Sequence, residues 1–179
     1  MNRGLISTRY AKALLQIGQE QGNLQHFLYD NATKFYNALN DTAEFDVFIK
    51  NPIIKDAQKK SMVRSVFGKM FNETMLNFIE IIIENRREML INDIFRNFLY
   101  LYRQQQGIKS VTVVTSISID DNYKNQIRKI LEKKLDAEIE LECKVDADII
   151  GGLIIIIDDK QADGSIAGEL RELKKKMIH

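Results

Sequence analysis

The amino-acid sequence predicts an α+β protein: an N-terminal six-helix bundle followed by a small βαββα C-terminal domain. Through the first 105 residues, apolar residues recur three or four positions apart, the spacing of helices. Near Gly107 the pattern changes to β-branched and alternating segments, the spacing of strands. A chain of 179 residues is long enough for two small domains. We therefore expect a helical domain over residues 1–105 and an α/β domain over residues 106–179.

The first three helices follow from their apolar faces and their boundaries. The first ends near Gly22, and its apolar face consists of Ile6, Tyr10, Ala13, Leu14 and Ile17. Asn23 is expected to cap the second, whose apolar residues are Leu24, Phe27, Leu28, Phe35 and Leu39. Asp41 or Thr42 caps a short third helix with Phe45, Phe48 and Ile49 inward. This helix stops at Asn51-Pro52, because the residue before proline avoids the α conformation.

The next three helices complete the bundle. The fourth runs from Lys55 to Phe67 and ends at Gly68, with Met62, Val63, Val66 and Phe67 at helical spacing. The fifth runs from Asn72 to Glu84. After a break at residues 85–87, the sixth carries Leu90, Ile91, Ile94, Phe95, Phe98, Leu99 and Tyr102.

The fifth helix has more apolar surface than a surface helix needs. Its apolar side chains cover roughly 220° of its circumference at about 100° per residue. A stripe of about 100° is enough for a surface helix of a globular domain. Two interpretations remain open: a central helix wrapped by its neighbours, or a helix whose flank receives a helix of another protein.

The second domain begins with a predicted strand over Lys109–Ile119. Asp120 or Asp121 caps a helix through Leu135, and a half-exposed strand alternates at Ile139, Leu141, Cys143 and Val145. After Gly151-Gly152, an unbroken apolar run predicts a central strand buried on both faces. Asp163-Gly164 predicts a turn, and Ser165 is expected to cap a last helix with Ile166, Leu170, Leu173 and Met177.

The sequence contains no pattern typical of an active site. His26 and His179 have no ligand-like companions, and Cys143 lies at an inward strand position. Gly151-Gly152 lacks the spacing of a phosphate-binding loop, and Asp158, Asp159 and Asp163 lack the pattern of a calcium loop. We therefore expect no catalytic residue, no cofactor and no metal.

Composition also limits the partners. The net charge is +1, so the chain has no overall basic field for nucleic acid. The longest apolar run, Ile149–Ile157, is far shorter than a membrane span. Membrane association is therefore expected only through a partner.

Several segments resemble one known family. Residues 9–14, RYAKAL, resemble the opening helix motif of the delta subunit of bacterial F-type ATP synthases, related to the mitochondrial oligomycin-sensitivity-conferring protein. Asn51-Pro52 before a basic helix, Glu84-Asn85-Arg86 before Leu90, and Gly107 before a strand are also similar. The most specific match is Val145–Ile156, VDADIIGGLIII, with Asp163-Gly164-Ser165-Ile166 after it. Together these segments cover the whole chain in order.

The resemblance implies a non-catalytic stator subunit. Its helical domain would bind the N-terminal helix of an ATP synthase alpha subunit, and its second domain would hold the C-terminal end of subunit b. Rotation driven by proton or sodium flow would thereby be coupled to ATP synthesis. The subunit would lie peripherally at the cytoplasmic face of the cell inner membrane, as part of the complex.

The resemblance also implies site residues. In the family the alpha helix lies between the first and fifth helices, which corresponds here to Tyr10, Ala13, Leu14 and Ile17 with Phe78, Ile79 and Ile82. The alternative that each of these residues belongs to the core of its own domain remains open. On this expectation, Ala13→Trp or Ile82→Asp abolishes peptide binding and leaves the circular dichroism unchanged. The signature residues Gly151, Gly152, Asp163, Gly164 and Ser165 are expected mainly to maintain the fold.

Two alternatives of other classes remain. The first is a nucleic-acid-binding helical adaptor, against which stand the near-neutral charge and the lack of a basic stripe with interleaved aromatics. The second is a small enzyme with an unfamiliar site, which activity of the isolated protein on a substrate would favour.

Overall fold

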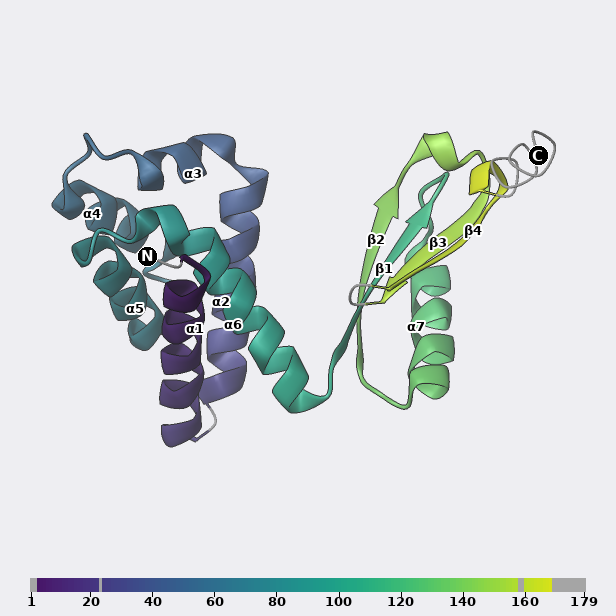
Figure 1. The fold of residues 1–179 in the computed structure, drawn as a ribbon, viewed down its shortest axis with the longest axis horizontal. Coiled ribbons are helices and arrows are strands. Elements are labelled where there is room, and N and C mark those ends of the chain that lie inside the picture. The colour runs from purple at the N-terminus through teal and green to yellow at the C-terminus, as the bar shows by residue number, and fades with distance from the viewer. Residues whose placement is uncertain (1–2, 23, 158–159, 169–179) are drawn as a thin grey trace. The chain divides into compact units, whose positions relative to one another are not determined.

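The computed structural model describes residues 3–22, 24–157 and 160–168. The chain divides into two compact units, Met1–Tyr102 and Arg103–His179. The first unit is helical, and the second holds a four-stranded sheet and the helix α7 (Figure 1). The predicted α+β class is confirmed.

All six predicted helices are present in the first part of the chain. They are α1 (Arg3–Glu20), α2 (Leu24–Asp41), α3 (Ala43–Lys50), α4 (Asp56–Phe67), α5 (Glu73–Glu84) and α6 (Ile91–Gln106), with a 3₁₀ turn η1 (Glu88–Leu90) before α6. The Asn72 side chain caps α5 by accepting a hydrogen bond from the Thr74 N–H at 2.8 Å. Gly68 follows α4 as predicted, and Arg86 breaks the chain after α5 with a left-handed φ of 54°. The expected cap Asn23 lies outside the described residues.

The core of the helical unit centres on Phe35, whose ring contacts those of Phe45, Phe67, Phe71 and Phe95. On α5, six apolar residues are buried in this core, and Ile81 is exposed. This favours the interpretation of α5 as a central helix wrapped by its own neighbours. Phe27 and Val66, placed on apolar faces by their spacing, are exposed because those faces are wider than the area that neighbouring helices cover.

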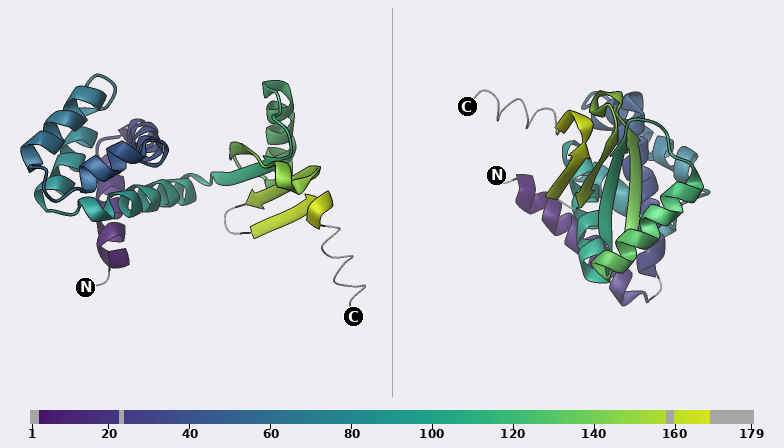
Figure 2. Two further views of the ribbon diagram at one scale, coloured as in Figure 1. Left: turned by 90° about the horizontal axis from the view of Figure 1, so that it is seen from above. Right: turned by 90° about the vertical axis from the view of Figure 1, so that its right-hand side faces the viewer.

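The second unit is built on one mixed sheet. Its elements are β1 (Lys109–Thr115), α7 (Asp121–Leu135), β2 (Ile139–Val145), a 3₁₀ turn η2 (Ala147–Ile149), β3 (Gly152–Ile157) and β4 (Lys160–Ser165). The strand order is β2-β1-β3-β4, with β1 and β2 parallel and the other pairs antiparallel. Helix α7 covers one face of the sheet, where Leu131 packs with Val111, Val113 and Ile139 (Figures 1 and 2).

Strand β4 was not predicted, and Asp163-Gly164 does not form the expected turn. Both residues lie in β4, where Asp163 pairs with Ile154 and Gly164 with Leu153. The strand is an edge strand of polar and small residues held by backbone hydrogen bonds, so it has no hydrophobic pattern. A helix does begin after Ser165, whose Oγ accepts a hydrogen bond from the Gly168 N–H at 3.0 Å. Leu170, Leu173 and Met177 lie outside the described residues.

The prediction that β3 is buried on both faces is wrong for the described residues. Strand β3 is an inner strand, between β1 and β4, as expected. Ile155 and Ile157 pack on the α7 side, whereas Ile154 and Ile156 alternate to the opposite face and are half-buried. Within the described residues of the second unit, α7 packs on the face that carries Ile155 and Ile157. The unbroken apolar run therefore predicts two apolar faces, of which α7 buries one.

Candidate partner-binding site

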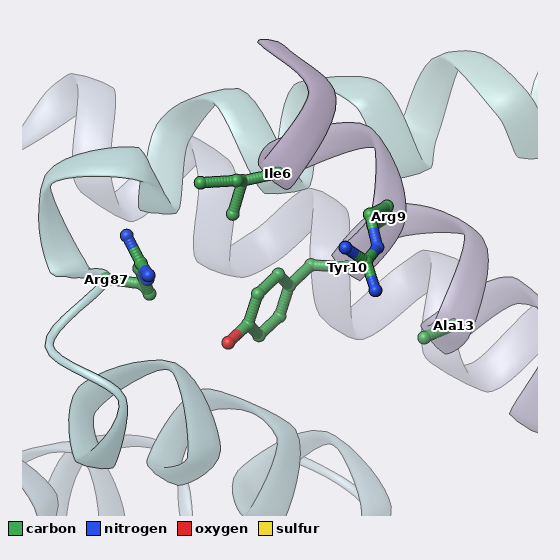
Figure 3. Close-up of a pocket in the computed structure, with 5 residues that line it drawn as sticks. All are labelled: Ile6, Arg9, Tyr10, Ala13 and Arg87. Carbon is green, nitrogen blue, oxygen red and sulfur yellow. The ribbon is translucent and has the colours of Figure 1, made fainter. Parts of the chain in front are cut away.

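Helix α1 carries an apolar stripe that its own unit leaves accessible. The stripe consists of Ile6, Tyr10, Ala13 and Ile17, spaced four, three and four residues apart, which keeps them on one face of a helix. Ala13 is exposed, and the other three are half-buried. Beside the stripe lies a depression of about 380 Å³ lined by Ile6, Arg9, Tyr10, Ala13 and Arg87. In Figure 3 Arg87 lies across the depression from α1, and Ile6 and Tyr10 point toward that side.

Tyr10 connects this depression to the central helix. Its ring contacts that of Phe78 on α5 edge-on, with centroids 6.3 Å apart and an interplanar angle of 65°. Edge-to-face pairs of this kind favour a fixed ring orientation. Tyr10 therefore forms the accessible surface above a core contact between α1 and α5.

The structure separates the predicted site residues into two groups. Tyr10, Ala13 and Ile17 are accessible, as expected for a docking surface. Leu14, Ile79 and Ile82 are 0% exposed and Phe78 is 5% exposed. The expectation that these four side chains line an open groove is therefore corrected: they belong to the buried core against which Ile6 and Tyr10 pack. Leu14 follows Ala13 by about 100° around the helix, which turns it into the bundle.

Two arginines line the depression and were not among the predicted site residues. Arg9 belongs to the first helix motif, and Arg87 lies in the predicted break after the fifth helix, so neither stood out by hydrophobic pattern. Within the described residues, neither guanidinium forms an ion pair with a carboxylate. An apolar stripe beside two cations can accept an amphipathic helix that carries a carboxylate next to its apolar face.

The signature residues come together at one end of the β3–β4 pair. Gly152 pairs with Ser165 and has a φ of 78°, and a Cβ placed on it would lie 2.3 Å from the Gly164 carbonyl oxygen. Ser165 Oγ donates to Asp163 Oδ1 at 2.6 Å, and the Ile166 N–H donates to the Gly151 carbonyl at 3.1 Å. All of these contacts join residues of the second unit to one another.

The described residues offer little for other chemistry. They contain no group of three or more histidine, cysteine, aspartate or glutamate side chains placed to hold a metal ion. Among the helices of the described residues, none has both the length and the apolar character needed to span a bilayer.

Comparison with known proteins identifies the family. Residues 6–177 match the family model "ATP synthase delta (OSCP) subunit". The chain is 32% identical to ATP synthase subunit delta of Synechocystis sp. over 94% of its own length and 91% of the relative's. It is 29% identical to ATP synthase subunit delta of Desulforamulus reducens, over 99% and 98% of the two chains.

A solved structure has the same fold. A chain of the Toxoplasma gondii mitochondrial ATP synthase hexamer, solved by cryo-EM, superimposes with a TM-score of 0.74 over 97% of each chain, at 21% identity. At this identity the similarity concerns the fold alone, whereas the family model covers almost the whole sequence. The chain belongs to the ATP synthase delta (OSCP) subunit family.

Proposed function

We propose that this ATP synthase subunit is the non-catalytic stator link of the complex. Its helical unit receives the N-terminal helix of an alpha subunit, and its second unit holds the C-terminal end of subunit b. The link resists the torque of the rotor, so that ion-driven rotation is coupled to ATP synthesis. In a bacterial cell the subunit would lie at the cytoplasmic face of the inner membrane, attached through the complex.

The observation that carries the first contact is the accessible stripe on α1. A helix bound there meets Ile6, Tyr10, Ala13 and Ile17, a set with the spacing of a helix-in-groove contact. The small side chain of Ala13 permits close approach of the two helices, and Tyr10 offers a large, oriented apolar surface. Several anchors along one stripe suit a tether that must hold under torque.

The charges beside the depression favour a bound helix that carries a carboxylate. Arg9 and Arg87 put two positive charges at the edge of the apolar depression. A carboxylate on the alpha helix beside its apolar face would pair with them, so binding should weaken as ionic strength rises.

The face of the sheet opposite α7 supports the second contact. Val114, Ile154 and Ile156 lie side by side on β1 and β3, because Val114 pairs with Ile154 and Thr112 with Ile156. All three are half-buried, opposite the face that α7 covers. We assign this face to subunit b, whose helical end could cover the apolar patch.

The alpha contact is tested with Ala13→Trp. An indole at this exposed position fills the space in which the docked helix must lie, so we expect the affinity for an alpha N-terminal peptide to fall at least about tenfold. Ala43→Trp, at another exposed alanine of the same unit, is the matched control and should bind normally. Titration calorimetry gives the affinities, and circular dichroism checks the fold. Wild-type affinity in Ala13→Trp would remove the assignment to α1.

The b contact is tested on the sheet. The double variant Ile154→Lys/Ile156→Lys should lose at least about tenfold in affinity for a peptide from the C-terminal end of subunit b. The control Ile130→Lys changes an exposed isoleucine on the outside of α7 and should bind normally. Equal binding by the double variant, with its circular dichroism intact, would exclude this face.

A further inference from the structure

We propose that a second cleft on the helical unit binds an acidic, amphipathic segment of a partner protein. This loop cleft has a volume of about 600 Å³, and its lining includes Pro52, Ile53, Lys55, Lys59, Arg86 and Met89. It lies where the loop between α3 and α4 meets the turn after α5. It shares no lining residue with the depression on α1.

The floor of the loop cleft is a buried ion pair. Lys59 on α4 is 1% exposed, and its Nζ lies 2.6 Å from Oε1 of Glu88 in η1. A buried pair of this kind is held by good geometry, because either charge alone would be costly to bury. The pair joins α4 to the turn after α5 and so fixes the two walls of the cleft relative to each other.

The rim presents large apolar side chains to solvent. Ile53, in the loop between α3 and α4, is 87% exposed, and Met89, in η1, is 63% exposed. The loops that carry them are hydrogen-bonded: the Ile53 N–H donates to Asn51 Oδ1 at 2.9 Å, and the Arg86 N–H donates to the Ile83 carbonyl at 2.9 Å. Two exposed apolar side chains around a cleft form a surface suited to an apolar partner.

The charged side chains that line the cleft favour an acidic partner. Lys50 pairs with Asp46, and Lys59 pairs with Glu88. Within the described residues, Lys55 and Arg86 have no carboxylate partner. Asp56, the lining carboxylate that remains, lies in the first turn of α4, where the helix dipole offsets its charge.

These two features together identify the occupant. Apolar side chains of a partner segment would contact Ile53 and Met89, and its carboxylates would pair with Lys55 and Arg86. An anionic membrane fits less well, because stable surface attraction takes about four to eight basic residues. Counting only pairs among the described residues, the loop cleft has two basic side chains without a carboxylate partner.

The test uses the full-length chain with Ala13→Trp, which blocks the depression on α1. The probe is a fluorescein-labelled synthetic helix of about 18 residues, with leucines on one face and glutamates along both edges. Fluorescence anisotropy measures its affinity. Ile53→Ser and the double variant Lys55→Glu/Arg86→Glu should each weaken binding at least about tenfold. The matched controls Val47→Ser and Lys69→Glu change exposed residues outside the cleft and should bind within about twofold.

Three results would overturn the proposal. One is unchanged binding by both cleft variants, whose substituted side chains are exposed and whose fold circular dichroism checks. A second is equal binding of a probe with lysine in place of glutamate. The third is no binding of the peptide together with Arg86-dependent binding to phosphatidylglycerol vesicles, which would assign the cleft to a membrane. None of these results bears on Ala13 and the alpha peptide.

Discussion

Ala13 and Leu14 are neighbours in the chain with opposite roles. Ala13 is exposed on the α1 stripe, and Leu14 is fully buried in the core. A rotation of about 100° per residue separates the two environments. At the residue scale, a substitution therefore reports on binding only where the side chain is accessible.

Ile82→Asp is expected to unfold the helical unit instead of reporting on binding. Ile82 is fully buried, so the variant loses an apolar core contact and places a carboxylate among apolar side chains. We expect a loss of at least about 4 kcal/mol in the free energy of unfolding. The adjacent Ile81→Asp is the control, since Ile81 is 46% exposed. Urea unfolding followed by far-UV circular dichroism should separate the two; equal midpoints would contradict the burial of Ile82.

Lys59→Met should be strongly destabilising because it leaves Glu88 buried without its cation. We expect a loss of about 3–5 kcal/mol in the free energy of unfolding. In the double variant Lys59→Met/Glu88→Leu neither charge remains, and most of the stability should return. The measurement is urea unfolding of both variants. A double variant no more stable than the single one would show that the pair is not the cause.

Gly152→Ala should destabilise the second unit. The new Cβ would lie 2.3 Å from the Gly164 carbonyl oxygen, and the backbone has a left-handed φ of 78°. We expect a cost of about 2–4 kcal/mol. Gly107→Ala is the matched control: its φ is 70°, but a Cβ there meets nothing within 4 Å, so the cost should be about 1 kcal/mol. Amide hydrogen exchange in β3 and β4 measures the difference.

At the scale of elements, burial favours one of the two interpretations of α5, the central helix wrapped by its neighbours. Helix α5 has a wider apolar arc than a surface helix needs, and its neighbours bury almost all of it. Helix α1 has a modest apolar face, and part of that face stays accessible. Which helix offers a docking surface thus depends on its position in the bundle, because a central helix is covered on several sides.

Asp120→Ala should weaken α7 at its N-terminus. The Asp120 Oδ1 accepts a hydrogen bond from the Tyr123 N–H at 2.8 Å, which satisfies one free donor of the first turn. Removing the cap should cost about 1 kcal/mol, measured as increased hydrogen exchange in the first turn of α7. Exchange at the wild-type rate in this variant would show that the cap contributes nothing.

Asp121→Ala serves as the control, because it changes the adjacent acid without touching the cap. A hydrogen bond from Lys124, reinforced by its charge, lowers the pKa of Asp121. A lowered folded-state pKa means that this contribution is present above the ordinary carboxyl pKa and is lost as pH falls through the lowered value. The free energy of unfolding of Asp121→Ala should therefore fall slightly less at acid pH than that of the wild type. At neutral pH this variant should lose less stability than Asp120→Ala.

At the scale of the whole molecule, the chain forms two compact units, to which we assign different partners. The helical unit carries the α1 depression and the loop cleft, and the second unit carries the sheet face opposite α7. The chain belongs to the ATP synthase delta (OSCP) subunit family, and the division of these surfaces between two partners is our proposal for how it acts in the complex.

The two units should bind their partners independently. We predict that a fragment of residues 1–106, which ends with α6, folds and binds the alpha peptide within about twofold of the full chain. A fragment of residues 107–179 should bind only the b peptide. Calorimetric titration of both fragments with both peptides is the measurement. Loss of alpha binding in a folded 1–106 fragment would show that the second unit contributes to that site.

The sequence predicted most of the fold because its signals are local. Helix periodicity located all six N-terminal helices. Gly68, Arg86 and Asp120 lie at the ends of helices, where the residue type and its immediate neighbours predict a helix end or cap. Strand β4 was missed, because an edge strand of polar residues is defined by its pairing partner and has no pattern of its own. The half-burial of Ile154 and Ile156 was also missed, because it depends on what packs against the sheet.

The accessible stripe on α1 could be predicted in part. Tyr10, Ala13 and Ile17 could be selected from the helix motif and its apolar face, and all three are accessible. Arg9 and Arg87 were missed because Arg87 is 78 residues further along the chain, and only folding brings it opposite α1. The loop cleft was missed for the same reason, since it joins two loops that are separate in sequence.

The sequence by itself determined the family, the fold class and the identity of nearly every element, because periodicity, caps and motifs act over a few residues. The tertiary structure alone decided which apolar surfaces remain open. Exposure depends on what other segments pack against a side chain, and that is a property of the assembled fold. Ile82 is buried and Ile53 exposed for this reason, although both are isoleucines in apolar stretches.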